Sequence, residues 1–317
     1  MPSFLRAAGT WAFSQPYLLL ALMALFWAVN VVLGRYIAGH VPPVALSFIR
    51  WAGAFCIVLP FAWPHLRRDW AEIRRRLGFM TVLSITGISA YNTMAYYGLQ
   101  FTQALNGLVL QSTGPLFVAL WSFLLFGERL SAKQMVGITM SLCGVLVIIS
   151  RGDLGVLLAI AFNAGDLWIV GGIVVFAFYS ALMKRRPEIH QLSFLAFTMG
   201  CGALWLIPFL ALEIRSGYVL TFDPLTLATL AYVTTFPSLV AYLFFNRGVE
   251  LIGPNRAAPF LHLTPVFGSV LAIAFLGEEP HLFHAVGYAL VLAGITIATR
   301  GASPPRRSAR AADRPGS

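Results

Sequence analysis

Long apolar runs separated by short polar connections dominate the 317-residue chain. About 20 helical residues, each rising about 1.5 Å, cross a bilayer hydrocarbon core of about 30 Å. Ten runs approach this length, and their short connections make consecutive helices antiparallel neighbours. We therefore predict an all-α integral membrane fold with ten transmembrane helices at 17–38, 44–63, 79–99, 104–126, 132–150, 166–183, 192–212, 225–246, 256–276 and 282–299.

Composition supports a lipid environment. The chain is 58% hydrophobic and only 11% charged, whereas a soluble domain carries about 25% charged residues. The first run is longer than the roughly 7–15 residues of a signal peptide core, so we interpret it as a retained helix. The net charge of +10 is spread over short clusters, which argues against a nucleic-acid patch. The three cysteines, Cys56, Cys143 and Cys201, lie inside apolar runs without metal-ligand spacing.

Basic residues alternate strongly between the two sets of connections. One set, together with both termini, holds 18 Lys and Arg residues, and the other holds only Arg35, Arg151 and Arg215. Positive charge is retained on the cytoplasmic side of inner membranes. We therefore expect both termini in the cytoplasm, which requires an even number of spans.

A period of 150 residues recurs along the chain. Identical residues at this offset are Gly98 and Gly248, Pro115 and Pro265, Phe117 and Phe267, Gly127-Glu128 and Gly277-Glu278, Val136-Gly137 and Val286-Gly287, Leu142 and Leu292, and Gly144 and Gly294. Such an ordered series indicates an internal duplication. Each half has five predicted spans, so the second half enters the membrane from the opposite side. This 5+5 inverted-topology repeat is typical of secondary transporters.

The repeat divides the chain into five parts. They are a cytoplasmic N-terminal segment (1–16), a first five-helix repeat (17–150), an external linker (151–165), a second repeat (166–299) and a basic cytoplasmic tail (300–317). The tail has nothing to bury, and we predict that it is disordered.

Several motifs resemble those of the EamA-type branch of the drug/metabolite transporter superfamily. They are Trp27-Ala28-Val29-Asn30, the run from Gly98 to Ala104, Phe126-Gly127-Glu128-Arg129-Leu130, Gly137 with Gly144, and the second-half copies around Pro265, Gly277-Glu278 and Gly287 with Gly294. The resemblance implies an inner-membrane carrier whose fifth and tenth helices are peripheral. It also implies export of amino acids or related metabolites, as by the YddG-type exporters.

Polar residues inside apolar helices need a partner or a cavity. The third span carries Tyr91, Asn92 and Tyr96, and its repeat mate carries Ser238, Tyr242 and Asn246. At the offset of 150, Asn92 matches Tyr242 and Tyr96 matches Asn246, so each copy has a Tyr and an Asn four residues apart on one helix face. We interpret them as substrate contacts. Hydrogen bonding between helices without any substrate is the alternative.

Two prolines mark a second group of candidates. Gln111 and Ser112 precede Pro115, and His262 precedes Pro265. A proline inside a helix removes one backbone hydrogen bond, so these breaks are candidate hinges next to substrate-binding side chains. A packing kink is the alternative, and His262 serves equally as a neutral, hydrogen-bonded residue or as a titrating one.

Arg50 is the only Lys or Arg well inside a predicted span, about six residues from its start, whereas Arg35, Lys133 and Arg256 lie within three residues of a span end. It suits the carboxylate of a substrate, which a guanidinium binds bidentately, or it snorkels to the external interface. Trp27, Asn30 and Tyr179 are further substrate-binding candidates. A single buried cation favours a neutral or zwitterionic solute over a strongly anionic one.

No catalytic, metal-binding or cofactor motif is present, including the Walker phosphate loop and the HExxH motif. We therefore expect a transporter rather than an enzyme, with a small-molecule substrate, lipid as its surroundings and no nucleic acid. None of the 12 acidic residues lies firmly in the middle of a span, which slightly favours an uncoupled facilitator over a proton-coupled carrier. A channel-like pore and a multidrug carrier are the rival functions, and the oligomeric state is left open.

Overall fold

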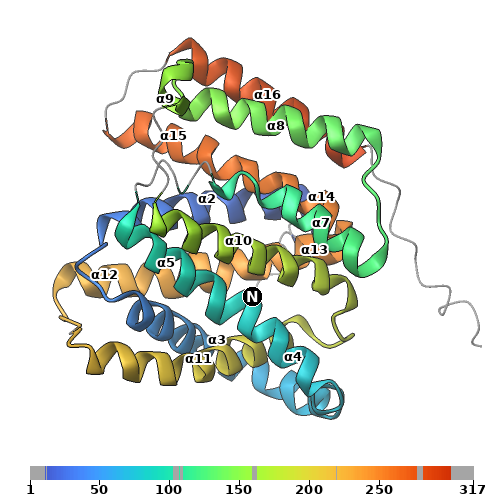
Figure 1. Ribbon diagram of the computed structural model, residues 1–317. Helices are drawn as coiled ribbons and strands as arrows, with labels where there is room; N and C mark the ends of the chain where they lie inside the picture. Colours follow the sequence, from blue (N-terminus) through green and yellow to red (C-terminus); the bar gives the residue numbers. More distant parts are fainter. Residues whose placement is uncertain are drawn as a thin grey trace, which may run out of the picture.

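The computed structural model describes residues 11, 13–102, 107, 110–158, 163–218, 220–276 and 281–300. Within them every regular element is a helix, and none is a strand (Figure 1). The first part folds into α2 (Pro16–Tyr36), α3 (Pro43–Arg75), α4 (Leu77–Ser84), the π-helix η1 (Ile85–Ala90), α5 (Tyr91–Phe101), α7 (Gly114–Phe126), α8 (Ala132–Ile149) and α9 (Leu154–Leu158).

The second part begins with α10 (Ala164–Leu182), the 3-10 helix η2 (Met183–Arg185) and α11 (Gln191–Arg215). It continues with α12 (Pro224–Val233), the π-helix η3 (Thr234–Val240), α13 (Ala241–Ile252), α14 (Pro254–Ala257), the 3-10 helix η4 (Ala258–His262), α15 (Leu263–Leu276) and α16 (Leu282–Arg300).

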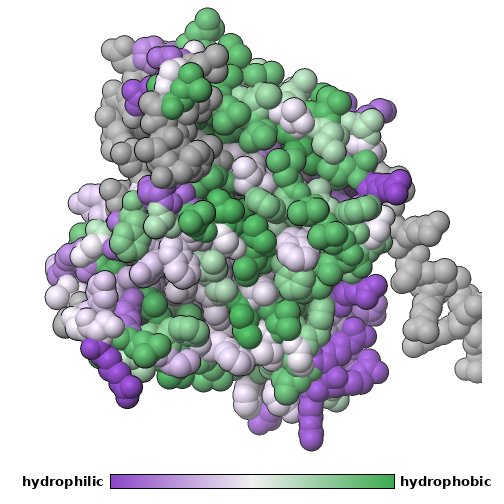
Figure 2. Space-filling view, viewed as in Figure 1, coloured by the Kyte–Doolittle hydropathy of each residue, from purple (hydrophilic) through white to green (hydrophobic). Residues whose placement is uncertain are grey.

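Seven helical stretches in the described residues are long and apolar enough to cross a membrane: Pro16–Gly34, Pro43–Arg75, Ala132–Ile149, Ala164–Arg185, Gln191–Arg215, Pro224–Ile252 and Leu282–Arg300. Large apolar side chains such as Phe123, Leu204 and Phe209 stand exposed on the outside. Figure 2 shows apolar residues over much of one face. Lipid covers such a surface, and the chain is a multi-pass membrane protein.

Three of the ten predicted spans are not among these seven. The span at 79–99 is helical as α4, η1 and α5, but it carries many polar residues. In the span at 104–126, a turn at Ser112 and Thr113 precedes α7, and most of 103–109 lies outside the described residues. The span at 256–276 starts as the short α14 and η4 before α15 begins. The count of ten therefore stays a prediction.

The two repeat-related prolines begin helices, and this corrects our expectation that they interrupt them. Pro115 is the second residue of α7, and Pro265 is the third residue of α15. The N–H groups of a first turn have no intrahelical partner, so a proline there removes no helical hydrogen bond. Pro115 follows the turn at Ser112 and Thr113, and Pro265 follows the change from the 3-10 helix η4 to α15, so neither proline lies in the middle of a continuous α-helix.

Helix α3 also differs from expectation, because it continues 12 residues past the predicted span end at Trp63. The added residues are polar but keep an apolar side, on which Leu66 packs against the core and Ile73 is buried. Glu72 adds ion pairs to Arg75 and Arg76 one turn away, at 2.7 and 2.9 Å. An amphipathic pattern thus extends a helix that hydrophobicity alone would end.

Helices α8 and α16 form a close antiparallel pair along one edge of the molecule (Figure 1). A Cβ atom built on Gly137 would lie 2.5 Å from Gly294 O, and one on Gly144 would lie 2.7 Å from Gly287 O. The contacts run in opposite directions along the two chains, so the helices are antiparallel. Small residues let the two backbones approach this closely, as is common between membrane helices.

Two further crossings use repeat-related glycines in the same way. Gly98 of α5 lies against α10, where an added Cβ would be 2.6 Å from Gly165 O. Gly248, 150 residues later in α13, lies against Leu20 of α2, also at 2.6 Å. The third helix of each half therefore packs on the first helix of the other half.

We expect Gly144→Ala to destabilise the protein by about 1–3 kcal/mol, because the new methyl group overpacks the α8–α16 contact. Thermal unfolding of the purified protein in detergent measures the effect as a lowered Tm. Gly268→Ala is the matched control, since a Cβ there meets no atom within 4 Å. Equal Tm values for the two variants would contradict this packing.

Candidate functional site

Two π-helices lie at the same place in the two halves, η1 at Ile85–Ala90 and η3 at Thr234–Val240. A π-turn disturbs the i→i−4 ladder, and such turns are frequent at functional sites. Gly87 O accepts a hydrogen bond from the Tyr242 hydroxyl at 2.6 Å. Pro237 O accepts one from Trp27 Nε1 at 3.1 Å. Residues 87 and 237 are repeat mates, so each π-helix offers the same carbonyl to an aromatic side chain of the opposite half.

The side chain at position 87, as well as its carbonyl, is constrained, because close packing requires a glycine there. A Cβ there would overlap the ring of Tyr179, whose Cγ atom would lie 2.7 Å away. Tyr179 is 1% exposed and belongs to α10. The first π-helix therefore packs closely against the first helix of the second half.

Arg50 of α3 lies in the interior and is 1% exposed. Its side chain therefore does not extend to the external membrane interface, which was the alternative to a buried position. Its Nε donates to Ser238 Oγ at 2.6 Å. Its Nη1 donates to Asn92 Oδ1 at 3.0 Å and to the Tyr96 hydroxyl at 2.6 Å. The guanidinium thus joins α3 and α5 of the first half to η3 of the second.

No carboxylate in the described residues forms an ion pair with Arg50. Instead the cation is held by neutral oxygens and by the ring of Trp51, whose centroid lies 4.6 Å from Cζ. A buried charge is tolerated only when hydrogen bonds replace its lost hydration. This site can accept an anionic group without first breaking an ion pair.

Asparagine–tyrosine hydrogen bonds occur in both halves with the roles exchanged. The Tyr96 hydroxyl donates to Asn30 Oδ1 at 2.8 Å, and the Tyr179 hydroxyl donates to Asn246 Oδ1 at 2.7 Å. Between the halves, Asn92 Nδ2 donates to the Tyr242 hydroxyl, its partner 150 residues away, at 3.2 Å.

All of these are contacts between helices, as the alternative interpretation foresaw. No open space separates them in this conformation, and Tyr242 and Asn246 are 0% exposed. Their role as substrate contacts stays a prediction.

The broken spans meet through His262. Its Nε2 donates to Ser112 O at 2.7 Å across 150 residues of sequence. The same carbonyl faces the break before α7, where Leu116 N bonds to Thr113 O instead. A carbonyl acceptor requires a proton on Nε2, and Nδ1 of this buried ring has no hydrogen-bond partner.

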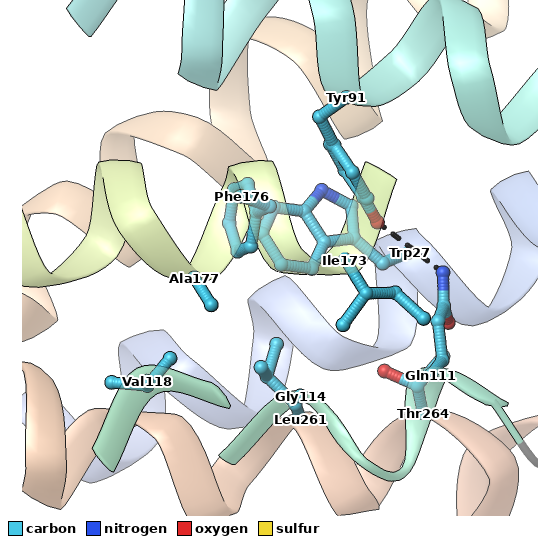
Figure 3. Close-up of a pocket in the computed structure, with 10 residues that line it drawn as sticks. All are labelled: Trp27, Tyr91, Gln111, Gly114, Val118, Ile173, Phe176, Ala177, Leu261 and Thr264. Carbon is cyan, nitrogen blue, oxygen red and sulfur yellow. Dashed lines mark hydrogen bonds between the residues drawn. The ribbon is translucent and has the colours of Figure 1, made fainter. Parts of the chain in front are cut away.

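A small pocket lies beside this network (Figure 3). Trp27, Tyr91 and Gln111, all predicted from the sequence, line it, and Gln111 Nε2 donates to the Tyr91 hydroxyl at 3.2 Å. Its free volume of about 20 Å³ accommodates about one water molecule. The further lining residues are Gly114, Val118, Ile173, Phe176, Ala177, Leu261 and Thr264.

Phe176 connects the pocket to the polar network. Its ring lies 4.6 Å from that of Tyr91 and 5.5 Å from that of Trp27. Trp27 in turn lies 5.6 Å from Tyr242 in an edge-on arrangement. The predicted residues therefore form one connected interior region rather than scattered sites.

Trp51 was missed by sequence reasoning. It is 0% exposed, lies 5.0 Å from Tyr242 edge-on and beneath the Arg50 guanidinium, and its Nε1 has no partner. Its place directly after Arg50, the arginine predicted to lie within the membrane, was the available signal. The π-helix carbonyls had no signal in the residue types, because backbone acceptors are common to every residue.

Polar contacts join the two halves at one end of the molecule. Glu128, between α7 and α8, forms an ion pair with Lys184 and accepts a hydrogen bond from Asn255 Nδ2 at 3.3 Å. Asp69 Oδ2 of α3 accepts from His190 N, at the start of α11, at 2.9 Å.

The opposite end is joined in a similar way. His40 Nε2 lies 2.7 Å from Asp223 Oδ2. The backbone N–H of Thr226, followed by the His40 ring, holds the pKa of Asp223 below its ordinary value. Glu213 accepts hydrogen bonds from the backbone N–H groups of Val44 and Ala45, at 2.9 and 2.7 Å.

Asp166 is the one carboxylate that is buried in the described residues, 2% exposed. It lies at the same end as the His40–Asp223 pair and accepts a hydrogen bond from Thr102 Oγ1 at 2.6 Å. It occupies the first turn of α10 as part of a capping box with Asn163. This position agrees with the expectation that acids stay out of the middle of the spans.

Comparison with known proteins places these features in context. The model of the EamA-like transporter family matches residues 15–150 and again 163–300. The uncharacterized transporter YyaM of Bacillus subtilis is 26% identical over 89% of this chain and 93% of its own. A probable amino-acid metabolite efflux pump of Escherichia coli is 27% identical over 87% of this chain and 92% of its own.

A probable terminal-alkyne amino-acid exporter of Streptantibioticus cattleyicolor is 25% identical over 74% of this chain and 77% of its own. The chain also superposes on the crystal structure of one protein with a TM-score of 0.70. The sequence identity there is 18%, over 90% of this chain and 97% of that chain, which shows a shared fold.

Tyr242→Phe is expected to lower stability by about 1–3 kcal/mol, because it leaves Gly87 O and Asn92 Nδ2 buried with one fewer partner each. Thermal unfolding in detergent measures the loss. Tyr97→Phe removes the same hydroxyl from a side chain that is 37% exposed, and it should leave the Tm unchanged. An unchanged Tm for Tyr242→Phe would show that the hydrogen bonds of the Tyr242 hydroxyl between the two halves do not stabilise the protein.

Proposed function

The chain belongs to the EamA-like transporter family, and on that premise we propose that it exports amino acids or related small metabolites across the inner membrane. The names of its relatives, which include amino-acid metabolite efflux pumps, support this substrate class. The family and these names point to transport and not to catalysis.

The buried position of Arg50 is the main observation in support of this proposal. A buried guanidinium without a described counter-charge, held by Ser238, Asn92 and Tyr96, suits the carboxylate of an amino acid. The adjoining aromatic surfaces of Trp27 and Phe176 suit an apolar side chain. The proposed substrate contacts are Trp27, Asn30, Arg50, Tyr91, Asn92, Tyr96, Gln111, Ser112, Tyr179, Ser238, Tyr242, Asn246 and His262.

The proposed topology has ten spans in two inverted halves, with both termini in the cytoplasm. The antiparallel pairing of α8 with α16, which are repeat mates, supports the inversion. The contacts between the halves support the assignment of sides, because each joins connections that the charge count places on one side. Glu128, Lys184 and Asn255 fall on the cytoplasmic side, and His40 and Asp223 fall on the external side.

Transport in this scheme proceeds by alternating access. The free volume of about 20 Å³ is too small for an amino acid, so the helices must separate to admit one. Opening toward the cytoplasm breaks the Glu128–Lys184 contact, and opening outward breaks the His40–Asp223 contact. The breaks before Pro115 and Pro265 are the proposed hinges, and α8 with α16 stays together as a peripheral pair.

Two rival functions are distinguished from the carrier by the transport experiments below. A channel-like pore would conduct without saturation, although an inverted repeat with a closed centre suits a carrier better. A multidrug or other metabolite carrier with proton coupling would need a titrating group on the pathway, and His262 with its free Nδ1 is the available one.

The Arg50→Lys variant tests the carboxylate site in proteoliposomes. We expect KM for an amino acid to rise about tenfold to a hundredfold, because a lysine cannot reproduce the donors to Ser238 and Asn92 together. Transport of the corresponding amino-acid amide, which has no carboxylate, should change far less. Arg215→Lys, at the exposed end of α11, is the control.

A parallel loss for the amide and the amino acid, with unchanged Tm, would assign Arg50 a purely structural role. A substrate panel of amino acids, amides and cationic drugs in the same vesicles separates the amino-acid carrier from the multidrug alternative.

Counterflow in the presence of a proton uncoupler tests the mode of transport. We expect saturable exchange that persists with the uncoupler at constant substrate gradient, because no described carboxylate lies in the middle of the pathway. Abolished exchange would instead favour proton coupling, and His262→Gln would then be the next variant. Flux that never saturates would support the channel.

A further inference from the structure

The extension of α3 beyond the membrane carries an exposed cluster of arginines. Arg67, Arg68, Arg74 and Arg75 line an open surface hollow together with Trp70 and Ala71. Figure 2 shows hydrophilic side chains gathered at the lower right, where Figure 1 places the end of α3 and the start of α4. Because the residues stand on a continuous helix, their spacing is fixed and does not depend on a loop.

Most of this charge is not neutralised by the protein. Glu72 pairs with Arg75 and Arg76, and Asp69 points to the backbone of His190. Arg67, Arg68 and Arg74 form no ion pair with a described carboxylate. Three unpaired guanidinium groups facing one hollow produce a strong local preference for an anion.

In the proposed topology the near end of the hollow, at Arg67 and Arg68, falls at the height of lipid headgroups, and Arg74 lies about two turns farther along α3. The apolar part of α3, from Pro43 to Trp63, rises about 32 Å at about 1.5 Å per residue, which matches the hydrocarbon core. Arg67 and Arg68 follow within the next turn or two. Trp63 and Trp70 are 47% and 49% exposed, and the Arg67 guanidinium lies 4.8 Å from the Trp63 ring centroid. Exposed tryptophans beside arginines are typical of the membrane interface.

We propose that this hollow binds the phosphate of an anionic phospholipid in the cytoplasmic leaflet. Charge complementarity selects the occupant, because Arg67, Arg68 and Arg74 offer donors to phosphate oxygens. Trp63 and Trp70 face the lipid beside it. The site is separate from the interior network around Arg50, and its function does not depend on the identity of the transported solute.

The test compares binding of two lipids with the same acyl chains, phosphatidylglycerol and phosphatidylcholine, to the full chain in detergent by native mass spectrometry. We expect the protein to retain phosphatidylglycerol preferentially. The triple variant Arg67→Gln, Arg68→Gln, Arg74→Gln should weaken that preference roughly tenfold to a hundredfold. Arg75 and Arg76 remain, so the connection keeps positive charge for orientation.

The matched control removes three charges from elsewhere, as Arg307→Gln, Arg310→Gln and Arg314→Gln, and it should keep the lipid preference. Equal retention of the two lipids by the unmodified protein would overturn the proposal, as would a preference that survives the triple variant. Equal losses in variant and control would also overturn it, by assigning the effect to net charge alone. If the triple variant does not purify, Arg74→Gln alone, on an exposed side chain, carries the same comparison with Arg310→Gln.

Discussion

A positive charge buried between two halves of a membrane protein constrains everything around it. The guanidinium of Arg50 has left water without gaining a described carboxylate, so neutral oxygens must surround it. Those oxygens come from α5 and from η3, which ties the halves together at the centre. Each supporting group then needs a partner of its own, and the hydrogen bonds continue outward through Asn30 and Tyr242. The interior is polar at its middle because one charge requires it.

Much of this arrangement follows from the sequence, because it depends on patterns that are local or periodic. Apolar length identified seven of the ten predicted spans. The offset of 150 identified Asn92 and Tyr242 as mates, and the structure places them in contact. The rest depends on packing between distant segments. Nothing local distinguishes η1 and η3 from α-helix, since the π-turns are stabilised by Tyr242 and Trp27 from other helices. The extension of α3 was missed because hydrophobicity ends before the helix does.

The edge and the centre of the molecule are held together by different kinds of contact. Along α8 and α16 glycine backbones touch, so separation of these helices would expose carbonyls to lipid. In the centre, side chains make the contacts, among them the hydrogen bond from His262 to Ser112 O. Ion pairs near the two ends, at Glu128 and at Asp223, are exposed enough for water to replace them at little free-energy cost.

The pairs that meet at a separation of 150 residues have a consequence for how such a chain changes over generations. Asn92 touches Tyr242, Ser141 Oγ donates to Val291 O, and His262 donates to Ser112 O. In a dimer of two identical single-repeat chains, each of these places would set a residue against its own copy, so one substitution would alter both sides of a contact at once. Duplication separates the two copies, and one becomes the donor while the other supplies the acceptor.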